Sequence, residues 1–178
     1  MKTSTKMLCY TALFTAVIAV CGFICVPVGE MKYTLQLLAV LVCGGVLGVK
    51  YGSIAVGAYL LLGAVGVPVF SGFSAGLFAS PTSGFLIGFL AAVIFTAWGY
   101  QFSCKQALFN HAVRIGFMIV GAAVCYAFGL AWFLLYFSGS HITLAYAFGV
   151  CVLPYLLFDG VKIALAGVLI EKLRTIVK

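Results

Sequence analysis

Two ionisable residues, Asp159 and Lys162, lie inside one of the most apolar stretches of the chain, Leu153 to Lys172. Their spacing of three places both side chains on one face of a helix. A carboxylate accepts hydrogen bonds and an ammonium group donates them, so together they can bind a polar molecule that carries both kinds of group. Each charge would cost roughly 2.5 to 3.5 kcal/mol at the centre of a bilayer, which favours a ligand-binding role. The alternative is a purely structural pair, or a Lys162 that extends to the membrane surface.

The composition places this pair in a membrane protein. Of 178 residues, 65% are hydrophobic and 7% are charged, and the mean hydropathy is +1.27. A helix needs about 20 residues to cross the hydrocarbon core, so the length allows about six crossings and almost no soluble domain. Barrel strands would alternate polar and apolar residues, and these runs do not. We therefore expect an all-α membrane protein, a single integral-membrane domain over residues 1–178.

Six transmembrane helices are expected in one bundle, and the first run has no clear cleavage site for removal as a signal peptide. The predicted spans are Met7 to Val28, Tyr33 to Val49, Ser53 to Val69, Gly84 to Phe102, Val113 to Phe137 and Ile142 to Ile170.

The basic residues between the spans predict the orientation. Eight of them fall on one side: Lys2, Lys6, Lys50, Lys105, Arg114, Lys172, Arg174 and Lys178. Only Lys32 falls on the other side. The positive-inside rule then places both termini in the cytoplasm. Single basic residues between apolar runs do not form a nucleic-acid-binding surface, so nucleic acid is not expected as a partner.

One long connection, Gly66 to Gly84, joins the third and fourth spans on the predicted outer side. Its glycines, serines and prolines oppose a helix, yet its aromatic and aliphatic residues are too apolar for an ordinary solvated loop. We expect this loop to dip into the mouth of the bundle and cap a pocket. A loop that rests on the lipid headgroups is the alternative.

Few other polar residues are available to line such a pocket with Asp159 and Lys162. Tyr155 and Phe148 lie on the same predicted helix face, and other helices offer a small further set: Gln36, Tyr59, Thr82 and Ser83. The seven cysteines form no metal-binding pattern. His111 and His141 are predicted on opposite sides of the membrane, so no catalytic site, metal or cofactor is expected.

The run from Tyr33 to Phe89, YTLQLLAVLVCGGVLGVKYGSIAVGAYLLLGAVGVPVFSGFSAGLFASPTSGFLIGF, together with the later DGVK, closely resembles the BioY family. These are biotin-binding S components of energy-coupling factor (ECF) transporters. The family pattern G-P-T-G-G reads Ser80-Pro81-Thr82-Ser83-Gly84 here. The resemblance implies capture of biotin from outside a bacterial cell membrane. It also implies assembly with a transmembrane coupling protein and two cytoplasmic ATPases. Since the chain itself has no phosphate-binding loop motif, ATP hydrolysis would belong to these partners.

The resemblance also suggests how biotin would lie. Asp159 would accept from a ureido N–H while Lys162 donates to the ureido carbonyl. The aromatic candidates to cover the ring and valerate chain are Tyr59, Tyr155, Phe85 and Phe148. The candidates to hold the carboxylate are Thr82, Ser83 and the amides near Gly72 and Gly76, since no spare cation is expected there. An inverted pose, with Lys162 on the carboxylate, stays open.

Ala12 and Ala16 match, by resemblance, the small-residue motif through which S components dock on the coupling protein. Small residues at this spacing also allow close packing within the bundle, which is the structural alternative. A further functional alternative is a self-sufficient secondary carrier in which Asp159 takes up a proton.

Overall fold

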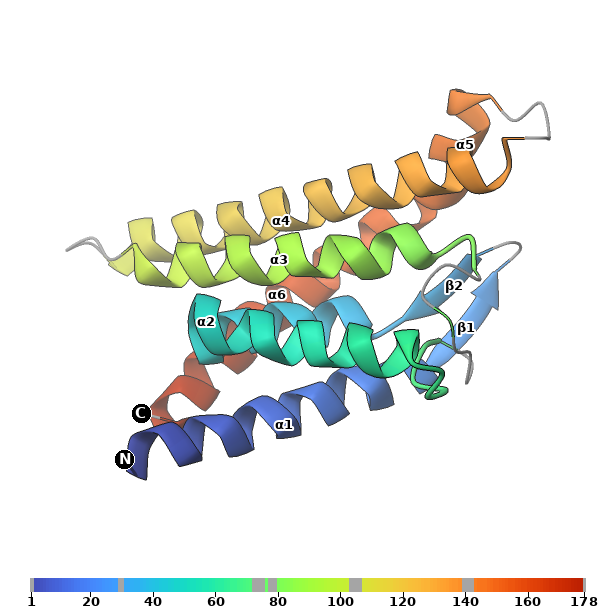
Figure 1. Ribbon diagram of the computed structural model, residues 1–178. Helices are drawn as coiled ribbons and strands as arrows, with labels where there is room; N and C mark the ends of the chain where they lie inside the picture. Colours follow the sequence, from blue (N-terminus) through green and yellow to red (C-terminus); the bar gives the residue numbers. More distant parts are fainter. Residues whose placement is uncertain are drawn as a thin grey trace.

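The computed structural model (Figure 1) describes residues 2–28, 31–71, 76, 80–102, 107–138 and 143–177. Its elements are α1 (Lys2–Phe23), β1 (Cys25–Val28), β2 (Met31–Thr34), α2 (Gln36–Ala64), α3 (Ser83–Gln101), α4 (Ala107–Tyr136), α5 (Leu144–Cys151) and α6 (Leu153–Val177). Five helical segments of this described chain are long and apolar enough to cross a bilayer, and α5 with α6 makes one of them. The predicted helical membrane bundle is confirmed at this level.

The predicted second and third spans both lie in α2, which reverses direction at Gly48 (Figure 1). Gly48 has φ 75° and ψ −176°, a conformation that is essentially restricted to glycine. Gln36 Nε2 donates to Tyr59 Oη, although 23 residues of straight helix would span about 35 Å. Near the turn, Cys43 Sγ donates to the Gly52 carbonyl at 3.9 Å. Residues 36–47 and 49–64 are therefore antiparallel arms of a helical hairpin.

The predicted first span runs to Val28, and this boundary is wrong. The helix ends at Phe23, and Cys25–Val28 pairs antiparallel with Met31–Thr34, with Cys25 opposite Thr34. Tyr33, predicted to begin the second helix, lies in β2. Pro27 lacks the N–H that a helix interior needs, and valine favours extended backbone. The fold is thus helical with one small β-hairpin, so the all-α prediction missed an element.

The sixth span, predicted as one helix from Ile142 to Ile170, is divided. Ile142 lies outside the described residues, α5 ends at Cys151, and α6 begins at Leu153. Val152 between them has φ −120° and ψ −56°. Pro154 occupies the first turn of α6, where its missing N–H would have no helical partner in any case. The helix axis is therefore free to change direction just before the Asp159 turn.

Both termini lie at one end of the bundle (Figure 1), and described basic residues make contacts there. Lys6 Nζ donates to the Val177 carbonyl at 3.1 Å, which joins the N-terminal helix to the C-terminal helix. Arg114 donates to Glu171 at 2.8 Å, which joins α4 to α6 there. Lys32 lies on the β-hairpin at the opposite end (Figure 1). The predicted segregation of charge is present, although Lys105 and Lys178 lie outside the described residues.

Small residues set the close contacts between α2, α3 and α4. A Cβ on Gly88 would lie 2.7 Å from the Cys125 Cα, and one on Gly121 would lie 3.1 Å from the Ala92 Cα. On the other side of α3, a Cβ on Gly52 would lie 3.0 Å from Val93 Cγ2. Such close backbone approach is how helices associate in lipid, where water does not drive packing.

The reversal at Gly48 generates the first prediction. Gly48→Ala should lower the free energy of unfolding by about 1–3 kcal/mol, because the added Cβ strains this backbone conformation. Apart from the adjacent residues of the chain, nothing lies within 4 Å of that Cβ, so the lost stability comes from backbone strain and not from a clash. Gly57→Ala is the matched control, since Gly57 is helical and also has open space around its Cβ. Denaturant unfolding in detergent measures both, and equal stability of the two variants would contradict a strained turn.

Candidate binding site

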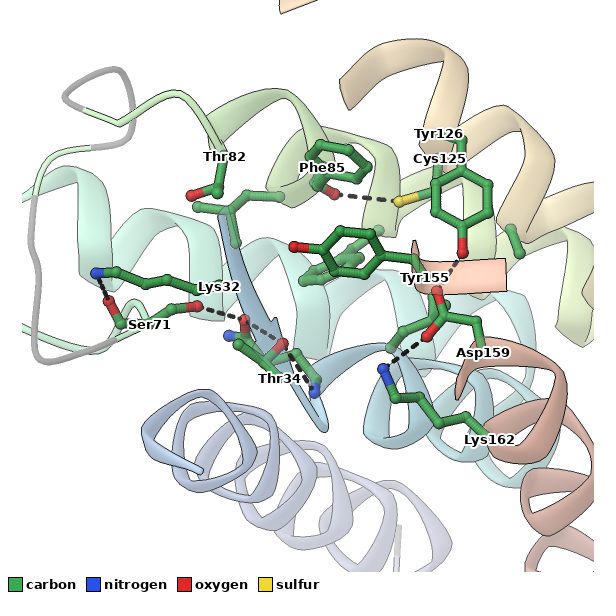
Figure 2. A pocket seen from close by; sticks show the side chains of 15 residues that line it. Lys32, Thr34, Ser71, Thr82, Phe85, Cys125, Tyr126, Tyr155, Asp159 and Lys162 are labelled. Atoms are coloured by element: carbon green, nitrogen blue, oxygen red, sulfur yellow. Dashed lines mark hydrogen bonds and ion pairs between the residues drawn. The ribbon is translucent and has the colours of Figure 1, made fainter. Parts of the chain in front are cut away.

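A cavity that is partly open to solvent lies where the β-hairpin meets α2, α3, α4 and α6 (Figure 2). Its lining is Lys32, Thr34, Gln36, Leu37, Ser71, Thr82, Phe85, Leu86, Phe89, Ala122, Cys125, Tyr126, Tyr155, Asp159 and Lys162. Polar and aromatic side chains thus share one space within an apolar bundle.

Asp159 and Lys162 form a buried ion pair on one wall of this cavity. Lys162 Nζ lies 2.6 Å from Asp159 Oδ1, and the residues are 8% and 5% exposed. Tyr126 Oη, from α4, donates to the other carboxylate oxygen, Oδ2 (Figure 2). Each carboxylate oxygen keeps a free lone pair, and the ammonium keeps unused N–H groups. The pair is therefore held in place while it retains hydrogen-bonding capacity.

A second polar network crosses the opposite wall and centres on Gln36. Its Oε1 accepts from Ser71 Oγ at 3.0 Å and from Thr34 Oγ1 at 3.3 Å, and its Nε2 donates to Tyr59. Lys32 Nζ donates to the Ser71 carbonyl at 2.9 Å (Figure 2). This network ties the β-hairpin, the segment after α2 and both arms of α2 to one another.

Aromatic rings separate the two polar walls. Tyr155 stacks on Tyr33 of the hairpin, with ring centroids 4.1 Å apart and planes 10° apart. On its other side Tyr155 lies 6.5 Å from the Phe85 ring at 25°. The Tyr155 Oη is buried and has no hydrogen-bond partner among the described residues, so a ligand could bind it. Burial, and then the nearby Asp159 carboxylate, raise the pKa of Tyr33, which favours its neutral phenol.

Six of the predicted site residues come together around the cavity: Asp159, Lys162, Gln36, Thr82, Phe85 and Tyr155. Tyr59 does not line it. Its side chain is fully buried behind Gln36, and its hydroxyl accepts a hydrogen bond from Gln36 Nε2. Its ring packs edge-on against Phe70, with ring centroids 5.4 Å apart. Its role is to hold Gln36 in place.

The structure corrects the predicted site at three residues, Ser83, Gly76 and Phe148. Ser83 is fully buried, and its hydroxyl donates to the Ser80 carbonyl at 2.8 Å. The Gly76 amide donates to the Gly63 carbonyl at 2.9 Å, so it is already bonded. Phe148 is 44% exposed and does not line the cavity, because the break before α6 removes α5 from the helix face that carries Asp159.

The remaining predicted residues are Gly72 and the alanine pair of α1. Gly72 lies outside the described residues. Ala12 and Ala16 are both exposed on α1, while Thr11 and Thr15 beside them are buried. The pair therefore faces away from the bundle core, and the alternative in which it packs inside the bundle is not what the structure has.

Sequence reasoning missed several residues of the cavity, chiefly Lys32, Ser71 and Tyr126. Tyr126 gave a signal, as a phenol within the apolar run of α4. Lys32 gave one too, as the single basic residue predicted on the outer side. Among the described residues, no three His, Cys, Asp or Glu side chains come together as a metal site. His111 lies 3.3 Å from Glu171 at the other end of the membrane-spanning bundle.

Comparison with known proteins gives consistent matches along the whole chain. The BioY family matches residues 1–178. A "Biotin transporter BioY" of Thermotoga maritima is 33% identical over 95% of this chain and 96% of its own length. The protein of the same name from Rhizobium etli is 38% identical over 92% of each chain. These relatives are named as transporters, not as enzymes.

A solved structure has the same fold. It is described as the "Crystal structure at 2.1 A of the S-component for biotin from an ECF-type ABC transporter". The TM-score is 0.83 at 27% identity, and the match covers 98% of this chain and 93% of that one.

The hydrogen bond from Tyr126 to Asp159 generates the second prediction. Tyr126→Phe should lower the free energy of unfolding by about 1–3 kcal/mol, since it removes a hydrogen bond to a buried charge. Tyr136→Phe is the control, because Tyr136 lies on the same helix and is 45% exposed. Denaturant unfolding of the unliganded protein in detergent compares the two. Equal stability would show that the phenol does not support the carboxylate.

Proposed function

The chain belongs to the BioY family, and from this membership we propose that it captures biotin at the outer face of the bacterial cytoplasmic membrane for uptake. The observation that carries the proposal is the buried Asp159–Lys162 pair on the wall of a cavity lined by polar and aromatic side chains. Charged residues at this depth are costly to bury, and charges inside membrane-spanning segments therefore mark functional sites. The curated relatives and the solved structure, all described as biotin proteins, support biotin as the ligand.

The chemistry of biotin suits the two groups. Its ureido ring offers two N–H donors and one carbonyl acceptor, so Asp159 would accept from an N–H and Lys162 would donate to the carbonyl. Because both groups already hold each other at 2.6 Å, a ligand needs little rearrangement to meet them. Phe85 and Tyr155 would cover the ring system, and the Tyr155 hydroxyl, which has no partner among the described residues, would gain a polar one.

The proposed membrane arrangement has six crossings, with the two arms of α2 as separate crossings and both termini in the cytoplasm. The described basic residues at the end with the termini, Lys6 and Arg114 among them, support this orientation. The connection from 66 to 84 would then lie outside as a cap. Phe70 is 3% exposed and Ser71 belongs to the Gln36 network, so the described start of this connection is packed into the bundle. One integral-membrane domain then accounts for the whole chain.

Uptake would be driven by partners, namely an ECF coupling protein and two cytoplasmic ATPases. The solved structure of the same fold is described as an S component of an ECF-type transporter, which supports this assembly. The exposed Ala12 and Ala16 on α1 give a smooth face on which another helix could pack closely.

The third prediction tests biotin binding. Asp159→Asn and Lys162→Ala should each weaken biotin binding by at least about tenfold, because each removes a charge-assisted hydrogen bond. Glu171→Gln is the control, since it removes a charge at the end of the bundle away from the cavity. Equilibrium binding of labelled biotin to the purified full chain in detergent is the measurement. If both cavity variants bind as the parent does, biotin binds elsewhere.

The fourth prediction tests the docking face. Ala12→Trp with Ala16→Trp should leave biotin binding intact and abolish ATP-driven uptake in cells that supply the coupling module. Leu165→Trp with Leu169→Trp is the control, because these residues are exposed at the same spacing on α6. The purified chain alone in liposomes should not accumulate biotin under a pH gradient. Accumulation there would favour the proton-coupled carrier instead.

A further inference from the structure

Among the described residues, the charges around the cavity do not balance. The described lining carries two ammonium groups, of Lys32 and Lys162, and one carboxylate, of Asp159. Asp159 is paired with Lys162 at 2.6 Å, while Lys32 donates to the uncharged Ser71 carbonyl. The other carboxylate among the described residues, Glu171, is paired with Arg114. The positive charge of Lys32 is therefore left without a described counter-ion, which suits an anionic ligand.

Lys32 and the ion pair lie on opposite sides of the cavity. Figure 2 shows Lys32, from β2, across the space from Asp159 and Lys162 of α6, with Tyr155 and Phe85 between them. The cavity thus has a polar wall that both donates and accepts, an aromatic middle and a cationic end. A molecule that fits this order has a neutral polar head, an apolar body and a terminal anion.

The structure also positions the Lys32 side chain. Lys32 and Thr34 are two apart in a strand, so both face the same side, and both line the cavity. The Ser71 carbonyl accepts one N–H of the ammonium at 2.9 Å, which leaves the other donors available. Ser71 is itself held by Gln36 at 3.0 Å. The Lys32 ammonium is therefore held at the Ser71 carbonyl before any ligand arrives.

We propose that Lys32 binds the carboxylate of the ligand, and that the pocket selects elongated monocarboxylates whose neutral polar head reaches Asp159 and Lys162. This inference rests on the proposed function and deepens it. It replaces the expectation that hydroxyls and loop amides alone hold the carboxylate, because the Ser83 hydroxyl and the Gly76 amide are bonded elsewhere. It also opposes the inverted pose, which would place the carboxylate on Lys162 and leave Lys32 with no anionic partner among the described residues.

The fifth prediction combines a changed residue with a changed ligand. Biotin and its neutral primary amide are titrated against the purified full chain as the parent and as four variants: Lys32→Gln, Lys32→Arg, Lys162→Ala and Lys50→Gln. The parent should bind biotin about 10- to 100-fold more tightly than the amide. Lys32→Gln should lose this preference by binding biotin more weakly while its affinity for the amide stays unchanged. Lys32→Arg should keep the preference.

Lys50→Gln is the charge-matched control, because Lys50 lies near the α2 reversal and outside the cavity lining. It should bind both ligands as the parent does. Equal weakening of both ligands in Lys32→Gln would mean that Lys32 only supports the fold, and that outcome overturns the inference. So does loss of the biotin preference in Lys162→Ala with the preference kept in Lys32→Gln, which indicates the inverted pose.

The two proposals fail in different ways. A parent chain that binds neither biotin nor its amide overturns the proposed function, and the Lys32 inference fails with it. A parent that binds biotin tightly, with a Lys32→Gln variant that still discriminates against the amide, overturns the Lys32 inference alone.

Discussion

The need to pair every polar group in an apolar bundle governs this structure. Asp159 meets the requirement with two donors, Lys162 on its own helix and Tyr126 on α4. The bond to Tyr126 also joins α4 to α6 near one end, as Arg114 and Glu171 do near the other. A carboxylate that would otherwise oppose membrane insertion thus becomes a contact between helices, and it also lines the cavity.

In the second polar network, uncharged groups pair with one another around Gln36. Gln36 has hydrogen bonds on both atoms of its amide, and its neighbours Ser71 and Tyr59 are bonded to it. The Gln36 amide is nearly saturated, whereas the Lys32 ammonium on the same wall keeps donors that no described residue accepts, and the Tyr155 hydroxyl has no partner among the described residues. Unsatisfied polar groups in a buried place favour a ligand that completes them. The site is therefore rigid on the Gln36 side and receptive at Lys32, Tyr155 and the ion pair.

Runs of about 20 apolar residues predicted α3 closely at both ends and α4 closely at its C-terminal end, whereas α4 begins at Ala107, before the predicted start at Val113. A spacing of three predicted the shared face of Asp159 and Lys162. Local pattern could not predict the break at Val152, because Pro154 is compatible with a helix that starts there or with one that continues through a kink. The same pattern predicted helix at Cys25–Val28, since apolar residues suit either structure. Lys32 and Tyr126 entered the site through contacts between distant segments, which spacing along the chain does not encode.

Three consecutive residues of β2 each bind a different part of the molecule. Lys32 reaches the segment after α2, Tyr33 stacks on α6, and Thr34 donates to Gln36 at the start of α2. Neighbouring residues in a strand point to opposite faces, so a shift of one position would exchange all three attachments together. A single-residue insertion or deletion within this strand should therefore be far less tolerable than a substitution, because the register of the strand holds all three attachments at once.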